Sequence, residues 1–192
     1  SIINEAEIPS IIYKVFSAFG MKRFCISVNN RKILNGFYAI LGLTEQSGDI
    51  MRTVDKLDKI GAEKVRALLT SEVGVEPDKA DEILKFIAIT GSNDQVLAAL
   101  EGYVGRNETF DEGLDQLKTV VKYLSSFGVP EENFAVDLTI ARGLDYYTGT
   151  VYETTLLDHP EIGSVCSGGR YDNLAGYYTD GRSPSSLPAS RT

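Results

Sequence analysis

The stretch that decides the fold is residues 109–140, which read TFDEGLDQLKTVVKYLSSFGVPEENFAVDLTI. Between residues 110 and 124, apolar side chains recur at helical spacing, which predicts one long amphipathic helix. Thr109, with Glu112 three residues later, predicts a capping box at the start of this helix. Over residues 134–140 the apolar side chains alternate with other types, a pattern typical of a half-buried strand. A long helix followed by a strand therefore forms the centre of the predicted fold.

The segments on either side of this unit predict further helices and strands. Residues 9–20 begin with a proline, carry apolar side chains at helical spacing and end with a glycine, so a helix is expected. Residues 24–28 alternate as a strand with one buried face, and residues 32–43 return to helical spacing. Downstream, strands are expected at residues 150–156 and 164–166, and the second of these leads into a pair of glycines.

Residues 44–108 show no strand pattern and are expected to form a succession of short helices. Pro77 opens one of them, and Ser92 with Gln95 predicts a capping box for the next. The chain as a whole predicts the α+β class, with an antiparallel sheet, helices to one side of it and a small all-α insertion. The expected parts are residues 1–43 and 109–180 of a sheet-containing domain, residues 44–108 as the insertion, and residues 181–192 as a flexible tail rich in serine and proline.

Composition and charge narrow the classes of function. A formal charge of −8 argues against a chain whose main work is to grip nucleic-acid phosphates, because such binding depends on lysine and arginine. No apolar stretch is long enough to cross a membrane, and no secretory signal is recognised.

Cys25 and Cys166 lack metal-binding or redox spacing, which favours two inert thiols in a reducing cytoplasm. The one histidine, His159, is expected in an exposed turn, so no histidine-based triad or multi-histidine metal site is predicted.

Residues 142–149, RGLDYYTG, concentrate groups that suit an anionic substrate with a polar ring. The guanidinium of Arg142 can fork two hydrogen bonds to a phosphate or carboxylate, and the hydroxyls of Tyr146 and Tyr147 can donate to or accept from a ring nitrogen. Because the segment follows one expected strand and precedes another, these side chains are placed at a sheet edge. The alternative is structural: Arg142 pairs with Asp145, and the tyrosines are packing residues.

Residues 167–174, SGGRYDNL, again place an arginine and a tyrosine next to a strand, after the pair Gly168 and Gly169. Glycine lets the backbone approach a ligand closely because it has no Cβ atom. The alternative is a tight turn or bulge that needs glycine for its own geometry. Taken alone, the glycine pair favours this structural interpretation.

These two segments resemble the signatures of a known family. ARGLDYYTGTVYET, residues 141–154, is similar to the histidine-specific signature of histidyl-tRNA synthetases, and SGGRYDNLAG, residues 167–176, is similar to the glycine-rich segment that follows it there. The order and spacing of the two also agree. The resemblance extends from the first helix to about residue 180. It places residues 44–108 where these enzymes carry an insertion between class II motif 2 and the histidine-specific signature.

The resemblance implies a role for each matching residue. Arg142 matches the arginine that contacts the α-phosphate of ATP and the substrate carboxylate, so it would be both the catalytic and the ATP-binding residue. A fixed cation there would stabilise the negative charge that builds on the phosphate oxygens during in-line attack. Arg170 and Asp172 would brace the second segment. The positions that would line the histidine pocket are Tyr146, Tyr147, Tyr171, Gly168 and Gly169.

The resemblance also implies substrates and partners for a whole enzyme. A class II synthetase of this family joins L-histidine to tRNA(His) through histidyl-adenylate, with ATP as a substrate. Mg²⁺ would accompany the nucleotide without an assigned protein ligand, and the working form would be a cytoplasmic homodimer. Motifs 1, 2 and 3 and the anticodon-binding domain are not recognised in this sequence. The chain is therefore expected to be an internal piece of a longer enzyme and to be inactive by itself.

Two other functions remain open. A paralogue of these enzymes serves as the regulatory subunit of ATP phosphoribosyltransferase and does not aminoacylate tRNA. That paralogue tends to lose the histidine signature, which this chain keeps. Alternatively, residues 44–108 act as a binding module for the acceptor end of tRNA, although their acidic balance argues against strong binding in isolation.

Overall fold

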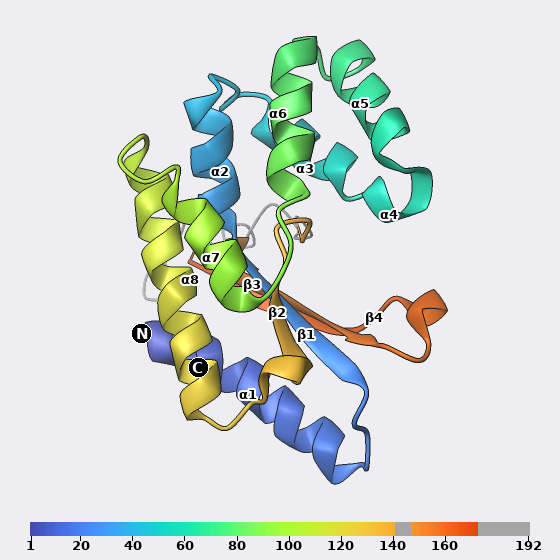
Figure 1. The fold of residues 1–192 in the computed structure, drawn as a ribbon, viewed down its shortest axis with the longest axis vertical. Coiled ribbons are helices and arrows are strands. Elements are labelled where there is room, and N and C mark those ends of the chain that lie inside the picture. The colour runs from blue at the N-terminus through green and yellow to red at the C-terminus, as the bar shows by residue number, and fades with distance from the viewer. Residues whose placement is uncertain (141–146, 173–192) are drawn as a thin grey trace, which may run out of the picture.

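The fold combines eight α-helices with one four-stranded sheet in residues 1–140 and 147–172, the part of the chain that the computed structural model describes (Figure 1). The α+β class is confirmed. The helices are α1 (Ile2–Ala18), α2 (Arg31–Ile40), α3 (Ser47–Val54), α4 (Leu57–Ile60), α5 (Ala62–Ser71), α6 (Pro77–Ile87), α7 (Asn93–Glu101) and α8 (Glu108–Ser126). The strands are β1 (Phe24–Asn30), β2 (Phe134–Val136), β3 (Tyr147–Leu156) and β4 (Ser164–Tyr171).

The sheet is mixed, and its strand order is β2-β1-β3-β4. Strand β3 pairs antiparallel with β1 and with β4, as expected. Strands β1 and β2 instead run parallel, with Ile26 opposite Phe134 and Val28 opposite Val136, so the prediction of a purely antiparallel sheet is wrong at this pair. The chain between them passes through helices α2 to α8. A long helical crossover of this kind brings the chain back to the same end of the sheet, and the next strand then runs parallel.

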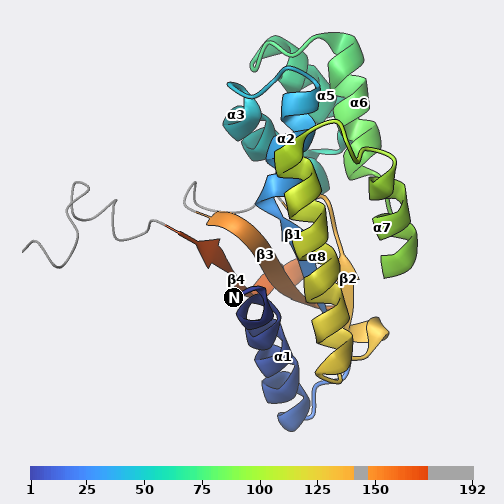
Figure 2. The ribbon, with the colours of Figure 1, turned by 90° about the vertical axis from the view of Figure 1, so that its left-hand side faces the viewer.

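Helices α1 and α8 lie against one side of the sheet (Figure 2). Phe24, Ile26 and Val28 of β1 are fully buried on that side. The ring of Phe24 contacts the rings of Tyr13 and Phe16 in α1, at centroid distances of 6.0 and 5.2 Å. Every second residue of this part of β1 is therefore in the core, which is the pattern that the sequence predicts for a strand with one apolar face.

Helix α1 begins at Ile2, although the sequence pattern predicts its start at Pro9. A proline inside a helix removes one backbone hydrogen bond and crowds the preceding turn. Ala6 is fully buried and Pro9 is also buried, so packing against the core offsets that loss. The hydroxyl of Ser10 donates to the carbonyl of Glu7 at 2.6 Å. The proline is thus packed within the helix instead of opening it.

Helices α2 and α8 cross at a close approach that two glycines permit. A Cβ atom at Gly36 would lie 2.5 Å from the backbone nitrogen of Phe110, and one at Gly113 would lie 2.7 Å from the backbone nitrogen of Ile33. A side chain at either position would overlap the backbone of the other helix. The two backbones therefore pack directly on each other, and this crossing fixes the start of α8 against α2.

Helix α8 has Asn107 as its N-cap, so the predicted cap at Thr109 is wrong. The backbone of Asn107 is extended, with φ −156° and ψ 127°, and its side-chain oxygen accepts a hydrogen bond from the backbone nitrogen of Phe110 at 3.0 Å. Thr109 already lies within the first helical turn. Asparagine and threonine both suit an N-cap. The sequence offers two neighbouring candidates, and the residue with the extended backbone caps the helix.

Residues 44–108, here called the helical block, contain helices and no strand, as predicted. Helices α3, α5 and α6 group beyond one end of the sheet (Figures 1 and 2). The predicted capping box is confirmed, because the side chain of Ser92 accepts from the backbone of Gln95 and the side chain of Gln95 accepts from the backbone of Ser92. The ring of Phe86 in α6 stacks on that of Phe37 in α2 at 3.9 Å. Aromatic packing therefore joins the helical block to α2.

A buried asparagine joins the helical block to the sheet. Asn93, at the start of α7, is 5% exposed. Its amide donates to the carbonyl of Phe134 at 3.3 Å and accepts from the backbone nitrogen of Val136 at 2.8 Å. Both of these backbone groups belong to β2, at the edge of the described sheet. The side chain thus provides the hydrogen bonds that a further strand would otherwise make.

Two predicted strands end at other residues in the structure. Strand β2 stops at Val136, whereas the alternating pattern continues to residue 140. The carboxylate of Asp137 accepts from the backbone nitrogen of Thr139 at 2.9 Å, and such local hydrogen bonds turn the chain away from the sheet. Strand β4 runs on through the glycine pair to Tyr171 instead of ending before it.

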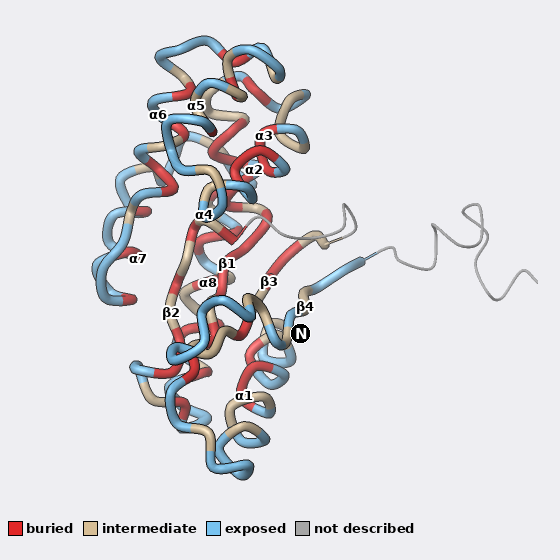
Figure 3. Tube along the Cα trace, turned by 90° about the vertical axis from the view of Figure 1, so that its right-hand side faces the viewer, coloured by how far each residue is buried: buried red, intermediate tan, exposed pale blue. Residues whose placement is uncertain are grey.

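Burial is uneven across the sheet (Figure 3). Strand β1 and the middle of β3 contain buried residues, whereas β4, at the other edge of the described sheet, has none. Within the described ranges, no helix has both the length and the apolar character needed to cross a bilayer.

Candidate functional site

The side of the sheet away from α1 is here called the open face, and it is defined by Ser27 of β1 and by Val151 and Glu153 of β3. Side chains of a strand alternate between the two faces of its sheet. The hydroxyl of Thr150 bonds to Glu5 of α1, so Thr150 points toward that helix. Val151 and Glu153 therefore point the other way, and Glu153 lies opposite Ser27 in the register.

Tyr147 lies on the open face against Gly169. A Cβ atom at Gly169 would be 2.9 Å from Cδ1 of Tyr147 and 3.0 Å from Cγ1 of Val151. Tyr147 is also opposite Tyr171 in the β3–β4 register. Three residues predicted to line one pocket thus meet at this end of the strand pair. Tyr147 is partly buried, whereas Tyr171 is 50% exposed.

Gly168 faces the opposite side of the sheet from Gly169. A Cβ atom there would overlap the hydroxyl of Tyr152, which lies directly across from it on β3. Burial is the main cause that raises the pKa of Tyr152, and the neighbouring Cys166 and Tyr147 raise it further. Its hydroxyl therefore stays protonated. Each glycine of the pair therefore makes room for a tyrosine of this chain, one on each face.

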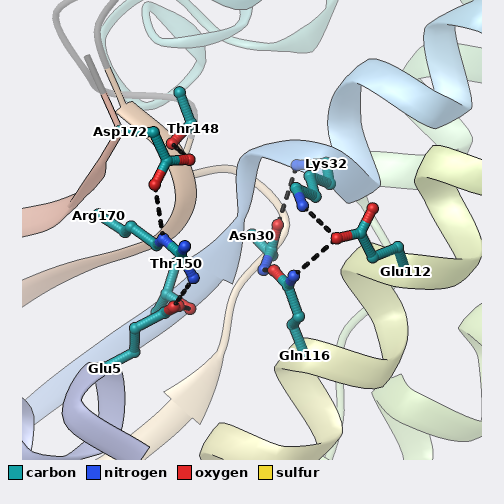
Figure 4. Close-up of polar contacts among 9 residues, drawn as sticks. All are labelled: Glu5, Asn30, Lys32, Glu112, Gln116, Thr148, Thr150, Arg170 and Asp172. Atoms are coloured by element: carbon teal, nitrogen blue, oxygen red, sulfur yellow. Dashed lines mark hydrogen bonds and ion pairs between the residues drawn. The ribbon is translucent and has the colours of Figure 1, made fainter. Parts of the chain in front are cut away.

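A set of five residues, here called the clamp, joins this end of the β3–β4 pair to α1 (Figure 4). The guanidinium of Arg170 donates from Nη1 to Oε1 of Glu5 at 2.6 Å and from Nε to Oδ1 of Asp172 at 3.0 Å. The hydroxyl of Thr148 donates to Oδ2 of Asp172 at 2.6 Å. The hydroxyl of Thr150 donates to Oε2 of Glu5. Both carboxylates of the clamp therefore receive one bond from Arg170 and one from a threonine of β3.

The clamp favours the charged forms of Arg170 and Asp172. Hydrogen bonds from Thr148 and then from Arg170 hold the pKa of Asp172 below its usual range. Bonds to Glu5 and then to Asp172 raise the pKa of Arg170. The side chain of Glu5 is 8% exposed, against 54% for Asp172. The Glu5–Arg170 pair is consequently less screened by water than the exposed ion pairs elsewhere on the surface.

A second polar group lies beside the clamp, where β1 meets α2 and α8 (Figure 4). Asn30 caps α2 by accepting from the backbone nitrogen of Lys32 at 2.9 Å, and its amide donates to Gln116 at 3.1 Å. The ammonium of Lys32 pairs with Glu112 at 2.5 Å. Asn30 lies opposite Thr150 in the β1–β3 register. These contacts fix the end of β1 next to the clamp.

A cavity of about 230 Å³ lies between the open face and the helical block. Ile140, two positions before Arg142 in the sequence, is among its lining residues. The four acidic residues that line it are Asp55, Asp58, Asp137 and Glu153.

Arg142 and Tyr146, two of the predicted site residues, lie outside the described residues. Of the other predicted positions, the structure brings Tyr147, Gly169 and Tyr171 together; Gly168 is adjacent in sequence but faces the other side of the sheet. The roles of all these residues in binding remain predictions.

The sequence pattern did not single out Glu5, Thr148 or Thr150 as members of this site. An acidic residue near the start of a helix is ordinary, because it also suits the helix dipole. Glu5 and Arg170 are 165 positions apart, so no local spacing could reveal their contact. Only the packing of α1 beside the β3–β4 pair brings them together.

The cysteines and the histidine lie apart from the clamp. Cys25 and Cys166 are free thiols, and burial raises the pKa of Cys25, so this thiol stays protonated. His159 lies in an exposed turn, as predicted, 3.1 Å from Glu161. Among the residues that the structure describes, no group of three or more histidine, cysteine, aspartate or glutamate side chains could hold a metal ion.

Comparisons with known proteins point to one family. A family profile described as "Histidyl-tRNA synthetase" matches residues 1–186 of this chain. A protein from Clostridium tetani named "Histidine--tRNA ligase" is 52% identical over 184 residues, and one of the same name from Xanthomonas campestris pv. campestris is 48% identical over 191 residues. Each match covers 96% of this chain but only 42% and 40%, respectively, of the relative. The chain thus spans about two fifths of the length of these relatives.

Two solved structures have the same fold. The crystal structure of histidyl-tRNA synthetase from Nostoc sp. PCC 7120 has a TM-score of 0.88 at 42% identity, and the match covers 94% of this chain and 42% of that one. A structure from Bacillus halodurans C, described as an ATP phosphoribosyltransferase regulatory subunit/histidyl-tRNA synthetase, has a TM-score of 0.73 at 20% identity over 93% of this chain and 45% of that one. The second likeness concerns the fold alone, whereas the first extends to the sequence.

Proposed function

The chain belongs to the histidyl-tRNA synthetase family, and we propose that, within a complete synthetase, it supplies one wall of the site that activates histidine with ATP. Activation would join the histidine carboxylate to the α-phosphorus of ATP and release pyrophosphate, which leaves histidyl-adenylate. A second step would transfer the histidyl group to tRNA(His). The chain spans 42% of the length of the Clostridium tetani ligase, so both steps are proposed for the complete enzyme and not for this chain alone.

The observation that carries the proposal is the position of Tyr147 against Gly169 on the open face. The two residues come from the two segments that resemble the signatures of the family. A phenol hydroxyl can donate to or accept from the imidazole nitrogens of histidine. A pocket whose polar groups need those nitrogens rejects rings without them, because its own groups are then left unpaired. The residues assigned to the histidine pocket are Tyr146, Tyr147, Tyr171, Gly168 and Gly169.

Arg142 is assigned to catalysis and to ATP binding. Its guanidinium would contact the α-phosphate and the histidine carboxylate as the new bond forms. In-line attack at phosphorus builds negative charge on the equatorial oxygens, and a fixed cation stabilises that charge more in the transition state than in the ground state. Mg²⁺ would accompany the phosphates of ATP, and no residue of this chain is assigned to it.

The helical block is proposed to be an insertion that leans over the acceptor end of tRNA(His). On this view residues 1–43 and 109–180 are parts of one catalytic domain, and residues 181–192 are a tail outside it. The stacked pair Phe37 and Phe86 supports a fixed position for the block beside α2. A cytoplasmic homodimer, in which each protomer carries one such site, completes the proposed working form.

A regulatory subunit of ATP phosphoribosyltransferase is the alternative function. The Bacillus halodurans C structure described as such a regulatory subunit is 20% identical to this chain in sequence, so the likeness concerns the fold alone. The relatives with 52% and 48% identity are named as ligases. Because the histidine-specific signature is also intact in residues 141–154, ligase activity is the function better supported.

The proposal can be tested in a hybrid synthetase, in which this chain replaces the matching segment of the Clostridium tetani ligase. In this hybrid, Arg142→Ala should lower the rate of adenylate formation about 10²-fold to 10³-fold, as loss of one charge-stabilising donor does in other enzymes. The dissociation constant of histidine should change far less. Arg23→Ala is the matched control, because Arg23 pairs with Asp158 on the surface. An unchanged rate in Arg142→Ala would show that the assigned role is wrong.

The chain by itself is expected not to activate histidine, because it spans only about two fifths of the length of its ligase relatives. Histidine-dependent exchange of labelled pyrophosphate into ATP should stay at background for the purified chain. Clear exchange by the chain alone would refute this expectation.

A further inference from the structure

We propose that Arg170 is a positioning residue for Tyr147: with Glu5 and Asp172 it fixes a bulge in β3 that sets the tyrosine ring against Gly169. The proposal rests on the assignment of Tyr147 to the histidine pocket. Arg170 would not touch histidine or ATP. It would act through the backbone of β3 and β4.

The bulge follows from the register of the two strands. Tyr147 lies opposite Tyr171, and Val151 lies opposite Gly169. Between these pairs β3 has residues 148–150, whereas β4 has only Arg170. Extra residues in one strand bend it and redirect the neighbouring side chains, and such bulges are frequent next to active sites.

The clamp is built from the residues of this bulge. Thr148 and Thr150, at its two ends, bond to Asp172 and to Glu5. Arg170 joins these two carboxylates, at 3.0 Å and 2.6 Å. The side chain of Arg170 also covers the middle of the bulge, because a Cβ atom at Gly149 would lie 3.2 Å from its Cδ. The bulge is therefore held at both ends and covered at its centre by one side chain.

The clamp determines which residue of β4 lies beside Tyr147. Without the bulge, regular pairing from Val151 and Gly169 would place Gly149 opposite Tyr171, and Tyr147 would lie one pair further from Gly169. The ring of Tyr147 packs beside Gly169 only while three residues of β3 remain opposite Arg170. If the clamp is lost, the bulge can rearrange, and Tyr147 moves along the strand away from Gly169.

Arginine is required here because its planar fork can donate to two carboxylates from different nitrogens at once. Lysine carries the same charge on one nitrogen and cannot reproduce both directions. Glu5 reaches the clamp from α1 and is nearly buried, so the clamp also ties the bulge to the helix on the other face of the sheet. The position of Tyr147 thus depends on a residue of α1 on the far side of the sheet.

The first experiment measures the position of Tyr147 in the 192-residue chain by NMR. The chain should show a nuclear Overhauser effect between the Tyr147 ring and the α-protons of Gly169. Arg170→Gln should abolish it, while Arg170→Lys should keep it in part. Arg66→Gln is the matched control, because Arg66 makes a two-bond pair with Asp81 far from the sheet. Retention of the contact in Arg170→Gln overturns the proposal, whatever the activity of the hybrid.

The second experiment measures histidine-dependent pyrophosphate exchange in the hybrid synthetase. Arg170→Gln should raise the KM for histidine about tenfold and leave kcat and the KM for ATP within about twofold, the pattern of lost ground-state binding. A general loss of folding would instead lower the active fraction for both substrates alike. An unchanged histidine KM, in a variant that has lost the NMR contact, overturns the role of Arg170.

Tyr147→Phe separates this inference from the proposed function. If Tyr147→Phe leaves the histidine KM unchanged, the assignment of Tyr147 to the histidine pocket fails. If Tyr147→Phe raises it and Arg170→Gln does not, only the positioning role of Arg170 fails.

Discussion

The missing side chain of Gly113 allows α2 and α8 to pack backbone to backbone. A Cβ atom there would lie 2.7 Å from the backbone nitrogen of Ile33, and rigid backbone cannot move away as a flexible side chain would. Gly113→Ala should therefore lower the free energy of unfolding by about 1–3 kcal/mol, the usual cost of overpacking. Chemical denaturation followed by circular dichroism would measure this change.

The control for this substitution is Gly48→Ala in α3. There the nearest atom to the new Cβ would be in the side chain of Arg52, at 3.6 Å, which is ordinary contact. Alanine is the better helix former, so this variant should gain up to about 1 kcal/mol. Equal losses in the two variants would show that backbone contact at Gly113 is not the cause.

At the scale of single residues, chemistry could be predicted where a side chain acts by itself. The exposure of His159 and the capping box of Ser92 followed from local sequence. The reason for the glycine pair could not be predicted from local sequence, because Gly168 and Gly169 make room for Tyr152 and Tyr147, which belong to another strand. The same holds for Glu5, whose partner is 165 positions away. Contacts of this kind depend on register, which local patterns do not contain.

Helix α8 offers a prediction at the scale of an element, since two residues near its start could cap it. Asn107→Ala should lower the free energy of unfolding by about 1 kcal/mol, because the backbone nitrogen of Phe110 loses its partner. Thr109→Ala should change it by a few tenths of a kcal/mol at most, since alanine suits the first turn. Urea denaturation of both variants would measure the difference. A larger loss in Thr109→Ala would restore the cap expected from sequence.

The β3–β4 pair should show a pH dependence that comes from Asp172. Its pKa is lowered in the folded chain by Thr148 and Arg170, whereas in the unfolded chain it should be about 3.9. A folded-state pKa below the unfolded one gives stability that is present above about pH 4 and is lost as the pH falls through the folded pKa. The chain should therefore be more stable than Asp172→Asn at pH 6, and this difference should shrink as the pH falls below 4.

This pH dependence can be measured by urea denaturation of both proteins at matched pH values. Glu108→Gln is a suitable control, because Glu108 is exposed and belongs to α8, not to the clamp. A difference between the chain and Asp172→Asn that stays constant down to pH 2 would contradict the role given to the carboxylate.

The existence of most elements was predictable, but their ends and their pairing were less so. Alternation and helical spacing found β1, α2, α8 and the strands after them, since these patterns report one apolar face directly. The start of α1 was missed because burial of Pro9 outweighs its cost within the helix. The end of β2 was missed because Asp137 turns the chain while the apolar alternation continues. The parallel pairing of β1 and β2 depends on the long crossover between them, not on either strand alone.

At the scale of the whole molecule, the helical block and the sheet form one continuous set of contacts. Asn93 bonds to the edge of β2, and Phe86 stacks on Phe37. The cavity lined by Asp58 and Glu153 lies where the two parts meet. The motifs in residues 141–154 and 167–176 indicated the family. The structure adds the clamp, which joins Thr148 and Thr150 of the first motif to Arg170 and Asp172 of the second.

The measurement that tests the central claim most directly is histidine-dependent exchange of labelled pyrophosphate into ATP by the hybrid synthetase. The hybrid carries this chain in place of the matching 184 residues of the Clostridium tetani ligase, at 52% identity. If this chain supplies a functional wall of the histidine site, the exchange rate should lie within about tenfold of that of the unmodified ligase and should require histidine. A hybrid that folds and melts like the unmodified ligase, yet shows no histidine-dependent exchange, would contradict the account.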